Sequence, residues 1–175
     1  VEVSPSQLEA QFWNEPKGTL PVSAEVIDTP DIAATVSERE LAKVRRAFEI
    51  PPSDTWTRTV SGTLSPGNAV LLRAMVENGL GTIAFAFGQR GKRAEQVAKE
   101  AIWDMQRYRN SSAPVDEFLA DQLLLPLALA GGGGFVATVL TPHFHSNVRV
   151  VESFLPLRIL TEQQDRFAWK VTVES

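Results

Sequence analysis

The chain has 175 residues, of which 43% are hydrophobic, and this composition is sufficient to bury the core of one or two globular domains. It contains no cysteine, which excludes disulfides, thiolate metal sites and a cysteine nucleophile, and which is compatible with a cytoplasmic location. The longest apolar run, LLLPLALA, is well short of the roughly 20 residues of a membrane span, so no membrane association is expected. A formal net charge of −4 excludes a broadly basic surface, although local basic patches remain compatible with it.

The first predicted unit begins with a short strand over residues 23–28 and a helix after it. Ser37 and Glu40 have the spacing of a capping box at the start of this helix, which should end before the Pro51-Pro52 pair. Its apolar positions recur at helical intervals, namely Leu41, Val44 and Phe48. A strand should follow over residues 56–61.

A hairpin and a second helix complete this unit. Residues 69–77 alternate as a strand, and Asn78-Gly79 predicts a tight hairpin turn into the strand TIAFAFG. The pattern of the returning strand predicts three buried residues on one face, Ile83, Phe85 and Phe87. The helix Ala94 to Arg109 follows, with one apolar stripe made of Val97, Ala101, Met105 and Tyr108. The result is a βαβββα unit over about residues 20 to 111.

A more apolar helix is expected next, capped by Ser111 or Ser112, kinked at Pro126 and terminated by the glycines from 131 onward. An aromatic ring, a carboxylate and a carboxamide share one face of this helix, because Phe118, Asp121 and Gln122 stand at i, i+3 and i+4. Such a polar interruption is common at a helix end that faces solvent, but it is also compatible with a binding site.

The remaining segment predicts strands over 135–140 and 148–151, a third that contains Arg158, and a last one that pairs with it across an EQQD turn. The last strand alternates Phe167, Trp169, Val171 and Val173. The glycine run is not a phosphate-binding Walker loop, since GxxxxGK[ST] is absent.

The only two histidines, His143 and His145, lie in the stretch TPHFHSN. On a strand both would face one side and could form half of a zinc site, but carboxylates would have to supply the other ligands, so no metal ligand is assigned. A single neutral imidazole could instead act as a general base or nucleophile near pH 7. Two ordinary surface histidines remain the third reading of the same residues.

Two long segments resemble the C-terminal signature of the RNA 3′-terminal phosphate cyclase family. They are VDEFLADQLLLPLALAGGGGF and TPHFHSNVRVVESFLPLRI, and the similarity extends upstream through SPGNAVLL, GQRGKRAEQVAKEA and SAEVIDTPDIAATVSERELAKV. The most specific features are the ADQL box and a histidine followed, after two residues, by a small hydroxyl residue and Asn. By this resemblance His143, rather than His145, falls on the family's nucleophile.

The resemblance implies an enzyme that uses ATP to convert an RNA 3′-phosphate into a 2′,3′-cyclic phosphate through a covalent histidine–AMP intermediate. ATP and a divalent ion, Mg²⁺ or Mn²⁺, would be required, and RNA with a 3′-phosphate end would be the partner. Phe118 matches the aromatic position that stacks on adenine, with Phe in place of the more usual Tyr. Asp121 and Gln122 match the box that lines the nucleotide site.

The resemblance also implies a domain organisation within the α+β class. Residues 1–19 and 112–175 would be parts of a main domain built from units of a four-stranded sheet with two helices, and residues 20–111 would be an inserted thioredoxin-like domain. Cyclases are about twice as long as this chain, so the N-terminal half of the family is expected as a missing segment or a separate polypeptide. The chain could also form a homo-oligomer.

The alternative function within the same family is a non-catalytic, cyclase-like scaffold in RNA or ribosome assembly. That branch lacks the nucleophilic histidine, so the presence of His143 favours the enzyme. Local basic clusters near residues 43–46, 90–93 and 107–109 could contact RNA, but they are more typical of solvated charges and helix ends, and no site is assigned to them.

Overall fold

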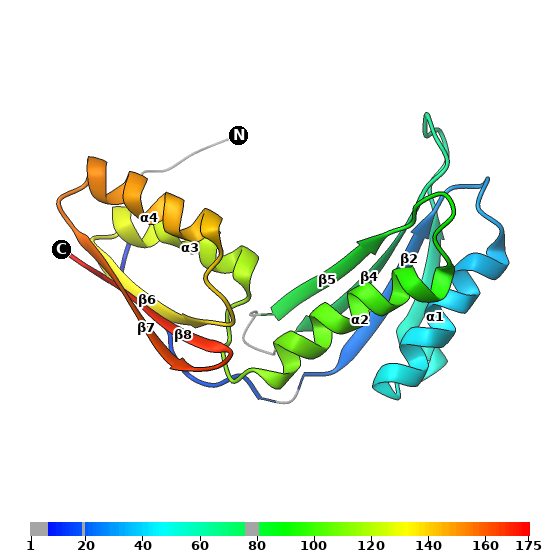
Figure 1. Cartoon of the computed structure of the whole chain (residues 1–175), viewed down its shortest axis with the longest axis horizontal. Coiled ribbons are helices and arrows are strands. Elements are labelled where there is room, and N and C mark those ends of the chain that lie inside the picture. Colours follow the sequence, from blue (N-terminus) through cyan, green and yellow to red (C-terminus); the bar gives the residue numbers. More distant parts are fainter. Residues whose placement is uncertain (1–6, 19, 76–80) are drawn as a thin grey trace. The chain divides into compact units, whose positions relative to one another are not determined.

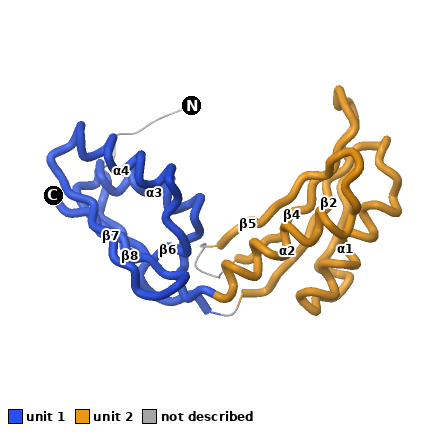
Figure 2. The backbone as a smooth tube through the Cα atoms, in the orientation of Figure 1, with its two compact units in different colours: residues 1–18, 111–175 blue, residues 19–110 orange. Residues whose placement is uncertain are grey.

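The computed structural model describes residues 7–18, 20–75 and 81–175 (Figure 1). The chain divides into two compact units, of which unit 1 comprises residues 1–18 and 111–175 and unit 2 comprises residues 19–110 (Figure 2). In the described residues each unit contains one four-stranded sheet and two α-helices. This mixed architecture is compatible with the expected α+β class.

Unit 2 contains the predicted βαβββα order. Its strands are β2 (Val22–Asp28), β3 (Thr55–Thr59), β4 (Asn68–Met75) and β5 (Gly81–Phe87), and its helices are α1 (Ala34–Phe48) and α2 (Ala94–Asn110), with a short 3₁₀ turn at Pro52–Asp54. The sheet order is β3-β2-β4-β5. Strand β2 pairs in parallel with β3 and antiparallel with β4, which pairs antiparallel with β5. The predicted Asn78-Gly79 turn lies outside the described residues.

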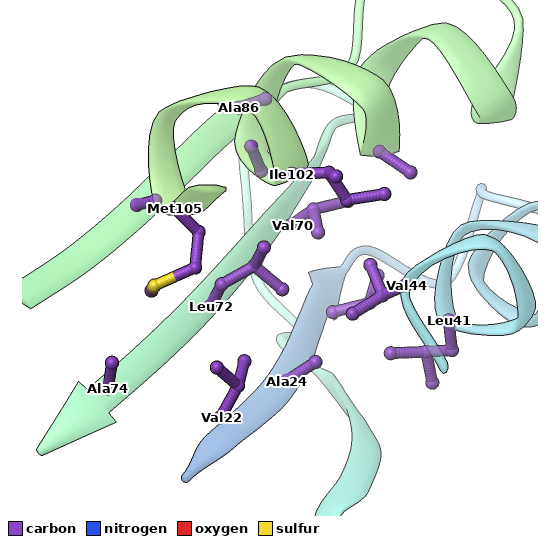
Figure 3. Close-up of a cluster of buried hydrophobic side chains, with 14 of the residues drawn as sticks. Val22, Ala24, Leu41, Val44, Val70, Leu72, Ala74, Ala86, Ile102 and Met105 are labelled. Atoms are coloured by element: carbon purple, nitrogen blue, oxygen red, sulfur yellow. The ribbon is translucent and has the colours of Figure 1, made fainter. Parts of the chain in front are cut away.

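The core of unit 2 lies between one face of this sheet and the two helices (Figure 3). Alternate residues of β2 and β4 point into it, and the predicted stripe of α2 packs against them; the buried set includes Val22, Ala24, Val70, Leu72, Ala74, Val97, Ala101, Met105 and Tyr108. Alternation therefore leaves the opposite side chains of each strand on a second, uncovered face.

The predicted buried face of β5 is wrong. Ile83, Phe85 and Phe87 are 45%, 44% and 61% exposed, whereas Ala84 and Ala86 are buried. Helix α2 packs directly on β5, and small side chains permit this close approach of helix and strand. Because side chains alternate along a strand, burying the alanines sends all three large residues to the uncovered face.

The predicted capping box of α1 is also wrong, because the helix begins three residues before Ser37. Ser37 and Glu40 are instead buried inside the helix. The Ser37 hydroxyl donates to Asp28 Oδ2 at 2.6 Å, and Asn68 Nδ2 donates to both carboxylate oxygens of Glu40 at 2.7 and 2.8 Å. These polar side chains therefore tie α1 to β2 and β4 rather than starting the helix.

Unit 1 places two helices on a second sheet of order β1-β6-β8-β7. Its strands are β1 (Gln11–Trp13), β6 (Gly132–Ala137), β7 (Arg158–Asp165) and β8 (Ala168–Glu174), and its helices are α3 (Glu117–Leu129) and α4 (Pro142–Phe154). Strand β1 pairs in parallel with β6, and the other neighbours are antiparallel. Helices α3 and α4 pack against each other, side by side over this sheet (Figure 1).

Three predicted boundaries in unit 1 are corrected. Asp116, and not Ser111 or Ser112, caps α3, which continues through Pro126 to Leu129. The predicted strand over 148–151 is part of α4, and the EQQD segment belongs to β7 rather than to a turn. The last strand and the strand containing Arg158 are present as predicted.

The glycine run both ends α3 and forms the start of β6. Gly133 has a φ of 132°, and a Cβ added there would lie 2.6 Å from the backbone oxygen of Gln11. Glycine is needed at this position because β1 approaches the β6 backbone so closely. Among the described residues, none of the helices has the length and apolar character required to cross a membrane.

Candidate functional site

His143 lies in the first turn of α4, not on a strand. Thr141 caps this helix, since its hydroxyl accepts a hydrogen bond from the Phe144 N–H at 3.1 Å, and Pro142 occupies the first helical position, where its missing N–H has no cost. The His143 side chain is 82% exposed. It therefore stands in solvent at the positive end of the helix dipole, where anions such as phosphate are favoured.

The helical setting separates the two histidines. Residues two apart on an α-helix point about 200° away from each other, so His143 and His145 do not form a paired site. The His145 ring lies edge-on to Phe144, with ring centroids 5.7 Å apart. No group of three or more histidine, cysteine or acidic side chains that could hold a metal ion occurs in the described part of the chain.

Helix α3 presents the other three candidate residues. Asp116 caps this helix through Oδ1, which accepts hydrogen bonds from the backbone N–H groups of Phe118 at 2.9 Å and Leu119 at 2.7 Å. Phe118 and Gln122 are exposed, one turn apart, while Asp121 is partly buried between them and α4. The helical spacing predicted for these residues is thus present, and it leaves an aromatic face in solvent.

Asp121 joins the two helices. Asn147 Nδ2 donates a hydrogen bond to Asp121 Oδ1 at 2.5 Å, and His143 Nδ1 lies 3.6 Å from Asp121 Oδ2. His143 and Asn147 are four residues apart, so both face α3 from one side of α4. The fold therefore brings together Asp121 and His143, which are 22 positions apart in the sequence.

Asn147 was missed as a positioning residue because the segment after it was predicted to be a strand. Its position four residues after His143 was available in the sequence, and so was the helix-start signal of Thr141 and Pro142. Had α4 been predicted as a helix, the spacing would have placed His143 and Asn147 on one face.

A packed layer beneath the site fixes the start of α4. Phe144 is fully buried, and its ring meets that of Phe135 in β6 edge-on, with centroids 6.5 Å apart. The Thr138 hydroxyl, directly after β6, donates to Glu117 Oε2 in the first turn of α3 at 3.2 Å. Both helix N-termini are therefore anchored at β6 or at the residue after it, and this anchoring fixes the backbone position of His143.

These elements form a surface suited to a nucleotide. The N-terminus of α4, whose first turn holds no acidic residue, favours phosphate. An exposed aromatic ring can stack on a base, and an exposed imidazole beside a carboxylate can act as a nucleophile. The family model for RNA 3′-terminal phosphate cyclase matches residues 16–160, which is most of the chain. The chain belongs to the RNA 3′-terminal phosphate cyclase family.

Relatives named RNA 3′-terminal phosphate cyclase match this cyclase-family chain along much of its length. The one from Pseudomonas fluorescens is 40% identical over 157 residues, which cover 90% of this chain and 45% of that protein. The one from Ralstonia nicotianae is 43% identical over 139 residues, or 79% of this chain and 39% of that protein. The one from Salmonella enteritidis is 42% identical over 127 residues, which cover 73% of this chain and 37% of that protein. The cyclase-family chain thus spans less than half the length of these relatives.

Proposed function

We propose that this chain carries the nucleotide-transferring part of an enzyme that converts RNA 3′-phosphate ends to 2′,3′-cyclic phosphates at the expense of ATP. The observation that carries the proposal is the exposed imidazole of His143 at the N-terminus of α4, 3.6 Å from the carboxylate of Asp121. Asn147 fixes that carboxylate by a hydrogen bond. The family membership supplies the reaction class.

In the first step of this proposal, His143 attacks the α-phosphorus of ATP. With an Nδ1–H directed toward Asp121, Nε2 keeps its lone pair and acts as the nucleophile. A bond forms between Nε2 and the α-phosphorus, the bond to the bridging oxygen breaks, and pyrophosphate leaves. The negative charge of Asp121 stabilises the positive charge that develops on the ring.

In the second step, an oxygen of the RNA 3′-phosphate attacks the α-phosphorus and releases His143. This gives an anhydride between AMP and the RNA end. The adjacent 2′-hydroxyl then attacks the 3′-phosphorus, loses its proton and expels AMP, and the ring closes. The detour is needed because a phosphate monoester has no good leaving group, whereas the anhydride releases AMP readily.

Phe118 and Gln122 would hold the nucleotide in this scheme. The exposed ring of Phe118 offers a stacking surface for adenine without the hydroxyl of a tyrosine, and the Gln122 carboxamide lies one turn away on the same side of α3. The N-terminus of α4 adds a favourable interaction with the phosphates. A divalent ion, Mg²⁺ or Mn²⁺, belongs to this proposal as a requirement of the reaction, and the described residues form no group of three or more ligands that would hold it.

The two units take different parts in this proposal. Unit 1, with its four-stranded sheet and two helices, would be a repeat of the cyclase main domain, and unit 2 would be the inserted, thioredoxin-like domain. The remaining part of the family's length, either in the same polypeptide or in a second one, would complete the site. RNA with a 3′-phosphate end is the proposed substrate.

The test is conversion of an RNA oligonucleotide whose 3′-phosphate carries the label. Cyclisation makes the label resistant to phosphatase. The chain is assayed alone and with a polypeptide that supplies the rest of the family's length, with and without ATP. We expect His143→Ala to abolish the resistance and His145→Ala to preserve it, since both histidines are exposed on α4 but only one faces Asp121. Equal loss in both variants, or no ATP-dependent product in any mixture, would contradict the proposal.

A further inference from the structure

The face of the unit 2 sheet that α1 and α2 leave uncovered is called the open face below. Strand alternation and the register assign it one set of side chains: Trp56 and Arg58 of β3, Ser23, Glu25 and Ile27 of β2, Ala69, Leu71, Arg73 and Met75 of β4, and Ile83, Phe85 and Phe87 of β5. Its large apolar members are exposed well beyond what a sheet buried on both faces would show. The site on unit 1 does not use this surface.

Three aromatic rings lie at the two edges of the open face. Trp56 belongs to the outer strand β3, and Phe85 and Phe87 belong to the outer strand β5, where their rings meet at 5.4 Å. The register places Trp56, Glu25, Leu71 and Phe85 in one row across the sheet. With neighbouring strands about 4.8 Å apart, Trp56 and Phe85 are separated by about 14 Å.

The charges of the open face are biased toward cations. Glu25 is its only carboxylate among the described residues, and it is buried between Arg58, which donates from Nε at 2.6 Å, and Arg73, which donates from Nη2 at 2.5 Å. Although burial opposes ionisation, the hydrogen bonds from both arginines keep the pKa of Glu25 below its ordinary value. Two guanidinium groups therefore share one carboxylate, and the face has a net charge of +1.

The two arginines are also placed to interact with a ligand. The Arg58 side chain is 57% exposed, so its guanidinium remains accessible beside its partner. The Arg73 guanidinium lies 5.7 Å from the centroid of the Trp56 ring, and its Nη1 is buried without a hydrogen-bond partner in the described structure. Because that nitrogen is buried, a ligand on the open face would contact Arg73 through the 27% of its side chain that is exposed.

We propose that the open face binds single-stranded RNA, with bases stacked on Trp56, Phe85 and Phe87 and phosphate or base oxygens contacted by Arg58 and Arg73. A sheet with helices on one side and exposed aromatic side chains on the other can stack successive bases, and arginine supplies both charge and stacking. Rings at both edges and an excess of cations match an extended polyanion with flat bases. The inference rests on the proposed function for its choice of RNA, and it gives unit 2 the task of holding the substrate.

A shallow groove continues this surface around the edge of β5. Its volume is about 730 Å³, and Phe85 and the exposed Trp103 of α2 lie along it. The charges of the side chains that line the groove cancel, because Lys92 and Lys99 are balanced by Glu100 and Asp104. The groove therefore offers RNA a further aromatic surface without adding net charge.

The direct test is binding of a fluorescent, unstructured 12-nucleotide RNA, followed by anisotropy, to the full chain and to the double variant Phe85→Ala/Phe87→Ala. Stacking on one aromatic side chain contributes about 5- to 150-fold in affinity, so we expect the double variant to bind at least about tenfold more weakly. The matched control is Phe12→Ala, which removes an exposed phenylalanine from a strand of unit 1 and should leave the affinity unchanged. Folding of each variant is checked by circular dichroism.

A second variant tests the electrostatic part. Arg58→Gln should reduce the slope of log affinity against log salt by about 0.7, the value for one phosphate contact with a single strand. Affinity unchanged in the double variant would overturn the proposal. So would a double variant that alters only the oligomeric state, since the open face would then be a protein interface.

Two variants separate RNA binding by the open face from AMP transfer by His143. His143→Ala should bind the RNA as well as the unaltered chain, and Phe85→Ala/Phe87→Ala should still accept AMP on His143. Loss of AMP transfer with intact RNA binding would remove the enzymatic proposal and leave the open face as an RNA-binding surface. The reverse result would retain the enzyme and remove the open face.

Discussion

Glu40 offers a test of how unit 2 is held together. Its side chain is fully buried in α1, and this burial raises the pKa of the carboxyl from 4.5 to about 7, against the opposing effect of the hydrogen bond from Asn68 and with a further increase from the charge of Asp28. The folded state therefore holds the Glu40 proton more tightly than the unfolded chain does. Replacing Glu40 with Gln removes this titration.

Because the pKa of Glu40 is raised in the folded state, the stability of unit 2 falls as the pH rises. As the pH rises from about 4.5 to about 7, the unfolded chain releases the proton first, so the free energy of unfolding falls and then levels off above pH 7. A tenfold change in a protonation constant corresponds to about 1.4 kcal/mol, so the loss over the whole pH range is at most about 3.5 kcal/mol. Relative to the unaltered chain, Glu40→Gln should therefore become more stable by up to about 3 kcal/mol between pH 5 and pH 8.

The assay is urea unfolding at pH 5 and pH 8. Replacing Trp13 and Trp169 with Phe leaves Trp56 and Trp103, so the fluorescence reports unit 2 alone. The matched control is Glu100→Gln, which alters an exposed carboxylate on α2 and should shift the stability difference between the two pH values by less than about 1 kcal/mol. A stability difference between Glu40→Gln and the unaltered chain that is the same at both pH values would refute the reasoning.

Two further predictions concern the foundation of the candidate site. Phe144→Ala should lower the free energy of unfolding of unit 1 by about 3–5 kcal/mol, because it removes a fully buried ring from its contact with Phe135. The control Phe154→Ala, which removes an exposed ring, should change this free energy by less than about 0.5 kcal/mol. Urea unfolding followed through the fluorescence of Trp169 compares the two variants. Asp116→Ala should lower the free energy of unfolding of unit 1 by about 1 kcal/mol, because it removes the cap of α3. Faster amide hydrogen exchange confined to the first turn of that helix would reveal the loss. Unchanged exchange there would show that the cap does not stabilise the helix.

The elements with a clear period were predictable from the sequence, and those in which two signals compete were not. The stripe of α2 was read correctly because its apolar residues recur at helical spacing and its surroundings are polar. In α4 the β-branched residues Val148, Val150 and Val151 imitated a strand and outweighed the cap at Thr141. On β5 the larger apolar set was assigned to the core, but packing of α2 requires the alanines there.

The same distinction holds for the candidate site. The shared face of Phe118, Asp121 and Gln122 follows from spacing within one helix, and the spacing could be read directly. The contact between Asp121 and His143 depends on how α3 and α4 pack against each other, and no local pattern encodes it. The exposure of the side chains on the open face likewise could not be predicted from the sequence, because it depends on the sheet order and on which side the helices cover.

The most direct test of His143 as the nucleophile is whether AMP becomes covalently attached to it. The chain, with the rest of the family's length supplied, is incubated with ATP labelled at the α-phosphate and a divalent ion, denatured, and cleaved into peptides. We predict label on the peptide that contains His143, retained in His145→Ala, lost in His143→Ala, and sensitive to acid as a phosphorus–nitrogen bond should be. Label on any other residue, or none in the complete mixture, would contradict the proposal that His143 is the nucleophile.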